Sequence, residues 1–294
     1  ATSNPQLFFA TYNLAPMATY PGELTGDIEL LKRLADAGDA ISIDRYSAQD
    51  LEIETKPDAT PVTDADKAVE RKIREILAEE RPKDLIIGEE YGRPESIAPN
   101  SRYWVIDPID GTKNFLRGVP IWATLIGIVH RNESGIDRVI AGMVSAPALF
   151  RRWYAATGFG AYTEVNGGIA TQIYASKVSK LSDASLSFSD LAGWGDRKGS
   201  YLNFLDKVWR VRGIGDFWSH MLVAEGAVDI AAEPSLALWD MVPLAVIVEE
   251  AGGVFSDLDG NLGPFGKSGI SANRSLHAQF LESIKIESIK SGGN

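Results

Sequence analysis

Acidic residues follow two apolar segments in the first half of the chain. Residues 85–87 lead into Gly88-Glu89-Glu90, and residues 103–106 lead into Asp107-Pro108-Ile109-Asp110-Gly111-Thr112. Asp-Pro and Asp-Gly are common in ordinary turns, so the second string alone leaves a plain turn open. Carboxylates at the ends of buried strands are costly, however, unless a cation neutralises them. Because the arrangement occurs twice, the pattern favours carboxylates that bind a metal ion.

The proline and the glycine of the second string indicate how its side chains are placed. Pro108 biases Asp107 toward an extended conformation, so Asp107 and Asp110 are expected on either side of a tight turn at a strand end. Gly111 and Thr112 then begin a new segment whose backbone N–H groups are suited to hold a phosphate. Metal binding and phosphate binding are therefore predicted side by side.

Composition limits which metal such a site can hold. The chain has no cysteine and only three histidines, His130, His220 and His277. Disulfides, thiolate nucleophiles and sites built from several histidines are thereby excluded, and oxygen ligands indicate Mg²⁺, Mn²⁺ or Ca²⁺. A chain without cysteine also fits a reducing cytoplasm, which is the compartment that we expect.

The charge balance indicates which partners the chain does not have. Its formal net charge is -11 and its pI is near 4.9, which makes it a poor general binder of nucleic acid or of an anionic membrane. No segment approaches the ~18 uninterrupted apolar residues of a membrane-spanning helix. We therefore expect no nucleic-acid and no membrane partner. A phosphorylated substrate is still compatible with this charge where divalent cations invert the local field.

Hydrophobic periodicity predicts the elements that position these acids. Helices are expected over 27–45, after residue 64, and over 199–208, 216–225, 240–251 and 275–289; strands are expected over 51–55, 85–87, 103–106, 122–130, 138–145, 151–156, 185–188, 209–213, 227–232 and 254–256. The runs at 122–130, 138–145 and 151–156 predict an antiparallel sheet, and the alternation beyond Gly168 predicts an α/β arrangement. The expected fold class is α/β, with an α+β first half and an α/β second half.

The same pattern divides the chain into three parts. Residues 1–22 show neither a period nor a secretory signal and are expected to form a loose N-terminal extension. Residues 23–172 are predicted to form an α+β metal-binding subdomain. Residues 173–294 are predicted to form an α/β substrate-binding subdomain.

Two candidate site residues also have a plain structural interpretation. Thr63 or Asp64 is placed to cap the second helix. Asp240 directly precedes the apolar segment 241–248, where an acid favours the start of a helix. A site role for Asp240 follows from the upstream motifs and not from its own surroundings.

Four motifs, in this order, resemble those of the inositol monophosphatase superfamily. They are Thr60-Pro61-Val62-Thr63-Asp64, Gly88-Glu89-Glu90, Trp104-Val105-Ile106-Asp107-Pro108-Ile109-Asp110-Gly111-Thr112-Lys113-Asn114-Phe115, and Leu238-Trp239-Asp240 followed by Glu249-Glu250-Ala251-Gly252-Gly253. The resemblance implies a layered α-β-α-β-α sandwich of the inositol monophosphatase and sugar phosphatase type. It also implies hydrolysis of a small phosphate monoester by a metal-activated water, without a covalent intermediate.

The resemblance further implies a set of metal ligands. One Mg²⁺ would be bound by Glu89, Asp107 and the backbone carbonyl of Ile109, and a second by Asp107, Asp110 and Asp240. A third, weaker ion is expected near Glu89, and Mn²⁺ is the alternative metal. Two neighbouring ions of this kind stabilise both the attacking and the leaving oxygen of a displacement.

Catalytic and substrate-binding roles are carried over in the same way. Glu89 and Thr112 would orient the water, and Asp64 would accept a hydrogen bond from the Thr112 hydroxyl. Gly111, Thr112 and Asp240 would lie against the substrate. Family members of this kind are commonly homodimers, and a homodimer is expected here. The candidate interface residues, which core packing would explain equally well, are Trp153, Phe159 and Tyr162.

Residues of the second half indicate which phosphate monoester is bound. Asp216 and Glu233 occupy the places where the family contacts the alcohol part of its substrate. Inositol phosphatases usually have a small neutral residue at the first of these places, whereas an acid suits a cationic alcohol. The alternative for Asp216 is that it only caps the helix beginning there. His220 is interpreted as a packed helix residue and not as a catalyst.

Several longer stretches resemble the actinobacterial histidinol-phosphate phosphatases within this superfamily. They are residues 146–153, 184–189, 208–212 and 223–234. The resemblance implies hydrolysis of L-histidinol phosphate in histidine biosynthesis, with Asp216 and Glu233 facing the cationic alcohol. The alternative enzyme is an inositol-1-phosphate phosphatase of broad specificity. A non-catalytic partner of the transcription or translation machinery is a third possibility, which the complete set of expected metal ligands disfavours.

Overall fold

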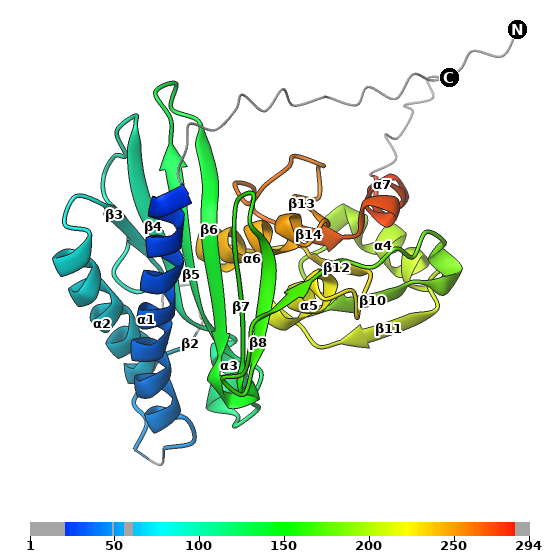
Figure 1. The fold of residues 1–294 in the computed structure, drawn as a ribbon. Coiled ribbons are helices and arrows are strands. Elements are labelled where there is room, and N and C mark those ends of the chain that lie inside the picture. The colour runs from blue at the N-terminus through cyan, green and yellow to red at the C-terminus, as the bar shows by residue number, and fades with distance from the viewer. Residues whose placement is uncertain (1–20, 49, 56–60, 286–294) are drawn as a thin grey trace, which may run out of the picture.

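The computed structural model describes residues 21–48, 50–55 and 61–285, which form five alternating layers of helices and sheets (Figure 1). Helices α1 (Pro21–Arg45) and α2 (Asp64–Glu80) cover the outer face of a seven-stranded sheet. Helices α5 (Asp216–Ala224) and α6 (Leu238–Glu250) fill the layer between this sheet and a five-stranded one. Helices α4 (Lys198–Leu205) and α7 (Arg274–Ser283) cover the far face of the second sheet. The predicted α-β-α-β-α sandwich is confirmed.

The seven-stranded sheet holds the strands that lead into the acidic motifs. Its order is β3 (Leu85–Gly88), β4 (Ser101–Asp110), β5 (Ala123–Arg131), β6 (Asp137–Ala146), β7 (Arg151–Ala156), β8 (Gly160–Val165) and β9 (Thr171–Ile173). All neighbours pair antiparallel except β3 and β4, which run parallel. The expected antiparallel pairing of the strands over 122–156 is confirmed, and the parallel pair at this edge was not predicted. Because parallel strands end on the same side, the residues after β3 meet the acids of β4.

The five-stranded sheet is mixed. Its order is β11 (Arg210–Gly213), β10 (Ser185–Phe188), β12 (Ile230–Glu233), β14 (Gly269–Ala272) and β13 (Val254–Ser256). Strands β11, β10 and β12 run parallel to one another. Strand β14 pairs antiparallel with both β12 and β13. Strand β12 therefore lies in the centre of the sheet, with its last residue at the side that faces the acidic motifs.

Two glycines let helix α6 approach the first sheet closely. Gly127 of β5 and Gly142 of β6 lie opposite each other in the sheet. A Cβ at Gly142 would lie 2.8 Å from the Cα of Pro243, and one at Gly127 would collide with the Val242 side chain. Since side chains at these two positions would push α6 outward, the glycines set the depth of the helix that begins with Asp240.

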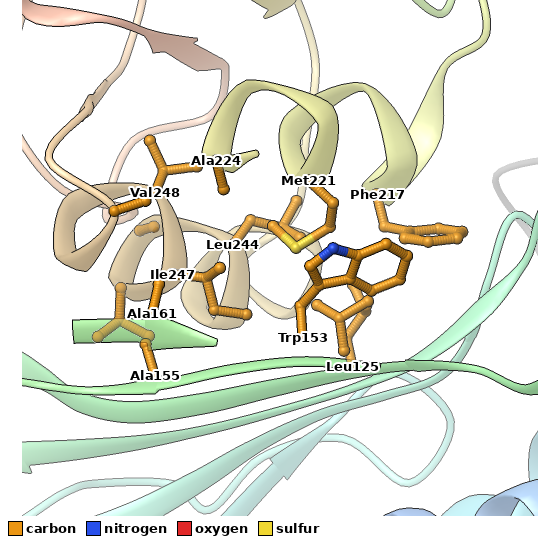
Figure 2. Packing of buried hydrophobic residues seen from close by; sticks show 14 of the residues in the cluster. Leu125, Trp153, Ala155, Ala161, Phe217, Met221, Ala224, Leu244, Ile247 and Val248 are labelled. Atoms are coloured by element: carbon orange, nitrogen blue, oxygen red, sulfur yellow. The ribbon is translucent and has the colours of Figure 1, made fainter. Parts of the chain in front are cut away.

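The middle layer is closed by an apolar cluster. Figure 2 shows Phe217 and Met221 of α5 and Leu244 of α6 packed over Leu125 and Trp153 of the sheet. The Trp153 ring is fully buried and lies edge-on to Phe217, with 6.0 Å between ring centroids. Burial of such large side chains stabilises the layer by roughly 2–3 kcal/mol each. Trp153 is therefore a core residue, which removes it from the candidates for a dimer interface.

Several predicted boundaries need correction. Helix α1 begins at Pro21 and not at Asp27, so the expected loose extension of residues 1–22 overlaps the helix; its residues 1–20 lie outside the described part of the chain. Helix α7 ends at Ser283, and the expected continuation beyond residue 285 lies outside the description too. The short elements β2 (Pro61–Thr63), paired with β1 (Ile53–Thr55), and α3 (Thr112–Leu116) were not predicted.

The proposed division of the chain, between residues 172 and 173, falls within β9, just before the connection between the two sheets. The first sheet ends at Ile173 with β9, and the second begins at Ser185 with β10. A boundary between residues 172 and 173 stays a proposal. None of the described helices is both long and apolar enough to cross a bilayer.

Candidate metal centre and active site

Asp107 and Asp110 both lie within strand β4, and not on either side of a turn beyond it. The pairing of β4 with β5 shifts register between these two residues, so the strand has a bulge there. A bulge adds a residue to one strand and redirects its side chains. Backbone amides then hold the two carboxylates: the Ile109 N–H donates to Asp107 Oδ1 at 3.0 Å, and the Phe217 N–H donates to Asp110 Oδ2 at 2.8 Å.

Asp240 reaches the same point from the middle layer. It lies in the first turn of α6, and its Oδ2 accepts the Ala237 N–H at 2.8 Å. One oxygen from each of Asp107, Asp110 and Asp240 lies within 4.8 Å of the other two. Three carboxylates from a sheet and a facing helix thus converge on one point, at a helix N-terminus that favours negative charge.

These carboxylates raise one another's pKa. Burial, followed by repulsion from Glu89 and the neighbouring acids, raises the pKa of Asp107 well above its usual range. Burial and repulsion from Asp216 and Asp240 do the same to the pKa of Asp110. Burial raises the pKa of Asp240 to about 7, with Glu89 and Glu233 adding to the shift. A divalent cation would remove this penalty, and an all-oxygen set of donors suits Mg²⁺ or Mn²⁺. The residues present therefore fit the metal that the motifs imply.

Glu89 follows β3 and lies beside Asp107, whose pKa it raises. The loop that carries Glu89 is bound by Glu70 of α2, which is fully buried. The Glu70 carboxylate accepts the Glu90 N–H at 2.7 Å and the Tyr91 N–H at 3.3 Å, and it pairs with Arg74 at 2.7 Å. A Cβ on Gly88 would collide with this carboxylate, so glycine is required there. Glu70 therefore fixes the backbone that presents Glu89.

The carboxylate beside Thr112 is Asp66, and the expected Asp64–Thr112 hydrogen bond is wrong. The Thr112 hydroxyl lies 3.5 Å from Asp66 Oδ1 and 3.1 Å from the Ile109 carbonyl oxygen. Asp64 instead pairs with Arg45 at 2.9 Å on the other side of the helix start. Thr63 is the N-cap of α2 and shares a capping box with Asp66, whose Oδ2 accepts the Thr63 N–H at 2.7 Å. The cap thus orients Asp66 toward Thr112.

Asp216, the first residue of α5, lies close to the residues that follow β4. Its Oδ2 accepts a hydrogen bond from Asn114 Nδ2 at 2.8 Å. Gly215 is the N-cap of α5, and Asp216 has a positive φ of 52°, so the alternative that Asp216 only caps its own helix is wrong. Burial, followed by repulsion from Glu233, raises the pKa of Asp216 to about 7, against the opposing effect of Lys113.

Gly111 lies between this acid and the metal cluster. It has a φ of 80°, and a Cβ there would lie 2.9 Å from the Ile121 carbonyl oxygen and 3.3 Å from Asp216 Oδ2. Only glycine fits both the backbone conformation and the space. Its role in holding a phosphate, like that of the Thr112 amide, stays a prediction.

Glu233 is the last residue of β12 and is 5 % exposed. Its Oε2 accepts the Ser189 hydroxyl at 2.7 Å, and its Oε1 lies 3.4 Å from His220 Nε2. Its charge reaches Asp110, Asp216 and Asp240, since it raises the pKa of all three. The structure therefore brings every predicted acid of the site together except Asp64.

Sequence reasoning missed Asp66, Glu70 and Asn114. The first two had a signal, because Asp66 and Glu70 lie on the buried face of α2 with Ile73 and Leu77. Acids at core positions of an amphipathic helix need a partner and so indicate a function. Asn114 had no such signal, since its contact with Asp216 joins residues far apart in sequence.

The chain has five alternating layers, and its carboxylates converge from a sheet and a facing helix. These features are typical of layered α/β proteins with an oxygen-ligand metal centre. Comparison with known proteins places the chain within that class. It belongs to the inositol monophosphatase family, whose profile matches residues 27–288.

Two characterised relatives are similar over nearly their whole length. The chain is 51 % identical over 258 residues to a histidinol-phosphatase of Streptomyces coelicolor, covering 87 % of this chain and 95 % of the relative. It is 50 % identical over 258 residues to a histidinol-phosphatase of Mycobacterium tuberculosis, covering 87 % and 96 %. Among solved structures, the extragenic suppressor protein suhB of Bartonella henselae is similar with a TM-score of 0.78 and 26 % identity, over 90 % of this chain and 100 % of that one.

Proposed function

We propose that this chain hydrolyses L-histidinol phosphate to L-histidinol and phosphate, with Mg²⁺ as its metal. The similarity to two histidinol-phosphatases at about half identity supports the reaction and the substrate. The observation in the structure that carries the proposal is the pair Asp216 and Glu233. Glu233 is buried and Asp216 is partly buried, both lie beside the carboxylate cluster, and both suit a cationic alcohol.

The metal would be held by the carboxylates already described. Asp107, Asp110 and Asp240 would bind one ion, and Glu89 with Asp107 and the Ile109 carbonyl would bind another. When bound, such ions neutralise the phosphate and lower the pKa of a coordinated water. Mn²⁺ is the alternative ion, and a third, weaker ion near Glu89 is part of the proposal.

The chain's own residues prepare the phosphate side of the reaction. Hydrolysis forms a bond between a water oxygen and phosphorus and breaks the ester bond to the alcohol, which takes up a proton. Glu89 and the Thr112 hydroxyl are placed to orient that water, with Asp66 and the Ile109 carbonyl orienting the hydroxyl in turn. The amides of Gly111 and Thr112 would hold the phosphate oxygens.

Asp216 and Glu233 select the alcohol. The two carboxylates repel each other when both are ionised, since Glu233 raises the pKa of Asp216. The ammonium group of histidinol would relieve that repulsion, whereas a neutral polyol would not. Charge-assisted hydrogen bonds of this kind contribute about 1.5–3 kcal/mol each. A preference of roughly ten- to a hundredfold per acid is therefore expected.

A phosphate-release assay tests the proposal. The wild-type chain is assayed with histidinol phosphate, inositol 1-phosphate, fructose 1,6-bisphosphate and glycerol 2-phosphate at saturating Mg²⁺. We expect the highest kcat/KM for histidinol phosphate, and equal kcat/KM for inositol 1-phosphate would favour the broad-specificity alternative. Asp216→Asn should lower kcat/KM for histidinol phosphate at least tenfold, because asparagine tolerates the positive φ but lacks the charge. Asp206→Asn makes the same charge change at an exposed position and is the matched control.

We also propose that the chain works as a homodimer in the cytoplasm. Phe159 remains a candidate interface residue, since its side chain is 48 % exposed. Light scattering of the purified chain would measure the oligomeric state directly.

A further inference from the structure

His220 is a buried residue in the middle of helix α5. Its side chain is fully buried, as expected for a packed helix residue, and its Nδ1 lies 2.7 Å from the Ser271 hydroxyl. A hydroxyl that donates to Nδ1 leaves the ring proton of a neutral imidazole on Nε2. The Ser271 hydroxyl, acting as that donor, would place the ring proton on Nε2.

The Nε2 atom of His220 points at Glu233. The distance from Nε2 to Glu233 Oε1 is 3.4 Å, and neither atom has another hydrogen-bond partner. A buried polar atom without a partner is costly. Two such atoms that face each other form a hydrogen bond after a small movement, and this pairing accounts for both.

The second sheet leaves the space for this contact. Ser271 and Gly269 of β14 lie opposite Ala231 and Glu233 of β12. A Cβ on Gly269 would lie 2.7 Å from Leu236 Cδ1 and 3.7 Å from His220 Cε1. Because Gly269 has no side chain, there is space next to Glu233, and the His220 imidazole and the Leu236 side chain fill it.

The donors around Glu233 include no lysine or arginine among the described residues, unlike those around Glu70 and Glu225. Glu70 pairs with Arg74, and Glu225 pairs with Arg151. Glu233 receives the Ser189 hydroxyl and faces the His220 imidazole, and within the described residues no lysine or arginine forms an ion pair with it. No lysine or arginine of the described residues therefore competes with a cationic ligand for this carboxylate.

We propose that His220 positions Glu233 for the cationic alcohol group of the substrate and is thus a specificity-determining residue. The inference rests on the proposed function and deepens it: Asp216 and His220, four residues apart, lie on one face of α5. One helix then supplies an acid of the alcohol site and the residue that orients the other acid. His220 does not touch the reacting atoms, and it acts through Glu233.

Two substitutions separate the two ends of the imidazole. Asparagine places its amide near the position of Nδ1, so His220→Asn keeps the contact with Ser271 and removes the donor to Glu233. Glutamine reaches the position of Nε2, so His220→Gln keeps the donor to Glu233. His277→Asn is the matched control, since His277 is another buried histidine that contacts a serine hydroxyl, Ser256, but no carboxylate.

The first measurement is the ratio of kcat/KM for histidinol phosphate to that for glycerol 2-phosphate. His220→Asn should lower the ratio about tenfold through KM, the effect of one hydrogen bond to a charged group. His220→Gln should restore most of it, and His277→Asn should leave the ratio unchanged. Equal losses on both substrates for His220→Asn would mean a purely structural role and overturn the inference.

The second measurement does not depend on the substrate. Nitrogen-15 NMR of the imidazoles should find the His220 proton on Nε2, and Glu233→Gln should shift that signal but not the His277 signal. A His220 signal that is unaffected by Glu233→Gln would overturn the inference even if the selectivity changed. If the wild-type chain shows no preference for histidinol phosphate while the NMR contact is present, the proposed substrate fails and the positioning of Glu233 stands.

Discussion

The acids on the two sides of the site are held in different ways. The metal side (Glu89, Asp107, Asp110 and Asp240) is held mainly through the backbone: amides of Ile109, Phe217 and Ala237 donate to three of its carboxylates. The alcohol side (Asp216 and Glu233) is held by side chains, namely Asn114, Ser189 and His220. Both sides are acidic and at least partly buried, and the pKa of Asp216 and of Asp240 is raised to about 7.

This difference bears on how each side can change. An amide donor is present whatever the side chain, so the metal side depends on the course of the backbone and tolerates few changes of fold. A side-chain donor can be replaced by a single substitution. The alcohol side can therefore be altered without disturbing the metal side, which is how one fold can serve several phosphate monoesters.

Asp110→Asn should have the largest effect, and it should affect all substrates equally. Asparagine keeps an oxygen for the Phe217 N–H but removes a charge from the cluster. We expect kcat/KM to fall at least about a thousandfold, on the order of 4 kcal/mol, for histidinol phosphate and for 4-nitrophenyl phosphate alike. Steady-state assays at saturating Mg²⁺ measure this directly.

The same variant should be more stable than the wild type when metals are removed. Burial and neighbouring acids raise the pKa of Asp110, so its charge opposes folding without a cation. Thermal unfolding in a chelator should therefore show a higher Tm for Asp110→Asn. Full activity in this variant would refute its assignment as a metal ligand, and a loss on only one substrate would break the distinction between the two sides.

Glu70→Gln should have an intermediate effect, confined to metal affinity. Glu89 is the one acid of the metal side whose loop is held by a buried side chain, Glu70, which accepts two amides and pairs with Arg74. Supporting residues of this kind typically change metal affinity by about 10–100-fold. Calorimetric titration with Mg²⁺ should show weaker binding by about tenfold, with kcat largely recovered at high Mg²⁺. Glu79→Gln, exposed on the same helix, is the control, and equal affinities in both variants would show that Glu70 does not support Glu89.

The sequence predicted the layers better than it predicted the contacts between them. Periodicity placed most helices and strands, and the family resemblance of the ordered motifs implied the five layers, which the structure confirms. The parallel pairing of β3 with β4 was not predictable, because pairing direction depends on contacts far apart in sequence. Strand β14 was missed because Gly269-Ile270-Ser271-Ala272 is too short to show a period.

Within the site, the error at Asp64 has a physical cause. Thr63-Asp64-Ala65-Asp66 offers two acids for one role, and the choice depends on which of them the cap holds. The capping box binds the acid at the third helical position, which is Asp66, and so turns Asp64 toward Arg45. The box could have been identified in the sequence. The neighbours of Asp216 and Glu233, in contrast, come from three separate parts of the chain, namely Asn114 of α3, Ser189 after β10 and His220 of α5, and could not be identified in the sequence.

His277→Gln should have the smallest effect on catalysis. It tests whether buried histidines of the helices next to the second sheet matter in general or only on the alcohol side. Burial lowers the pKa of His277 to about 4, and its Nε2 contacts the Ser256 hydroxyl, a contact that glutamine can keep. The native chain keeps this ring neutral at pH values where the unfolded chain, with a pKa near 6.5, binds a proton. Stability from this residue is therefore complete above about pH 6.5 and is lost as the pH falls toward 4.

The loss from His277 between pH 7 and pH 5 amounts to about 2 kcal/mol, from about 1.4 kcal/mol per unit of pKa difference. The acids of the site act in the opposite direction, since their raised pKa values favour the folded state at low pH. These acids are the same in the wild type and in His277→Gln. Their contributions therefore cancel when the unfolding free energies of the two proteins, measured with urea in a chelator, are subtracted. When the pH is lowered from 7 to 5, the unfolding free energy of the variant minus that of the wild type should rise by about 2 kcal/mol. The ratio of kcat/KM for histidinol phosphate to that for glycerol 2-phosphate should not change in His277→Gln. A change as large as that in His220→Asn would mean that the alcohol side depends on the packing around the whole second sheet and not on its own side-chain donors.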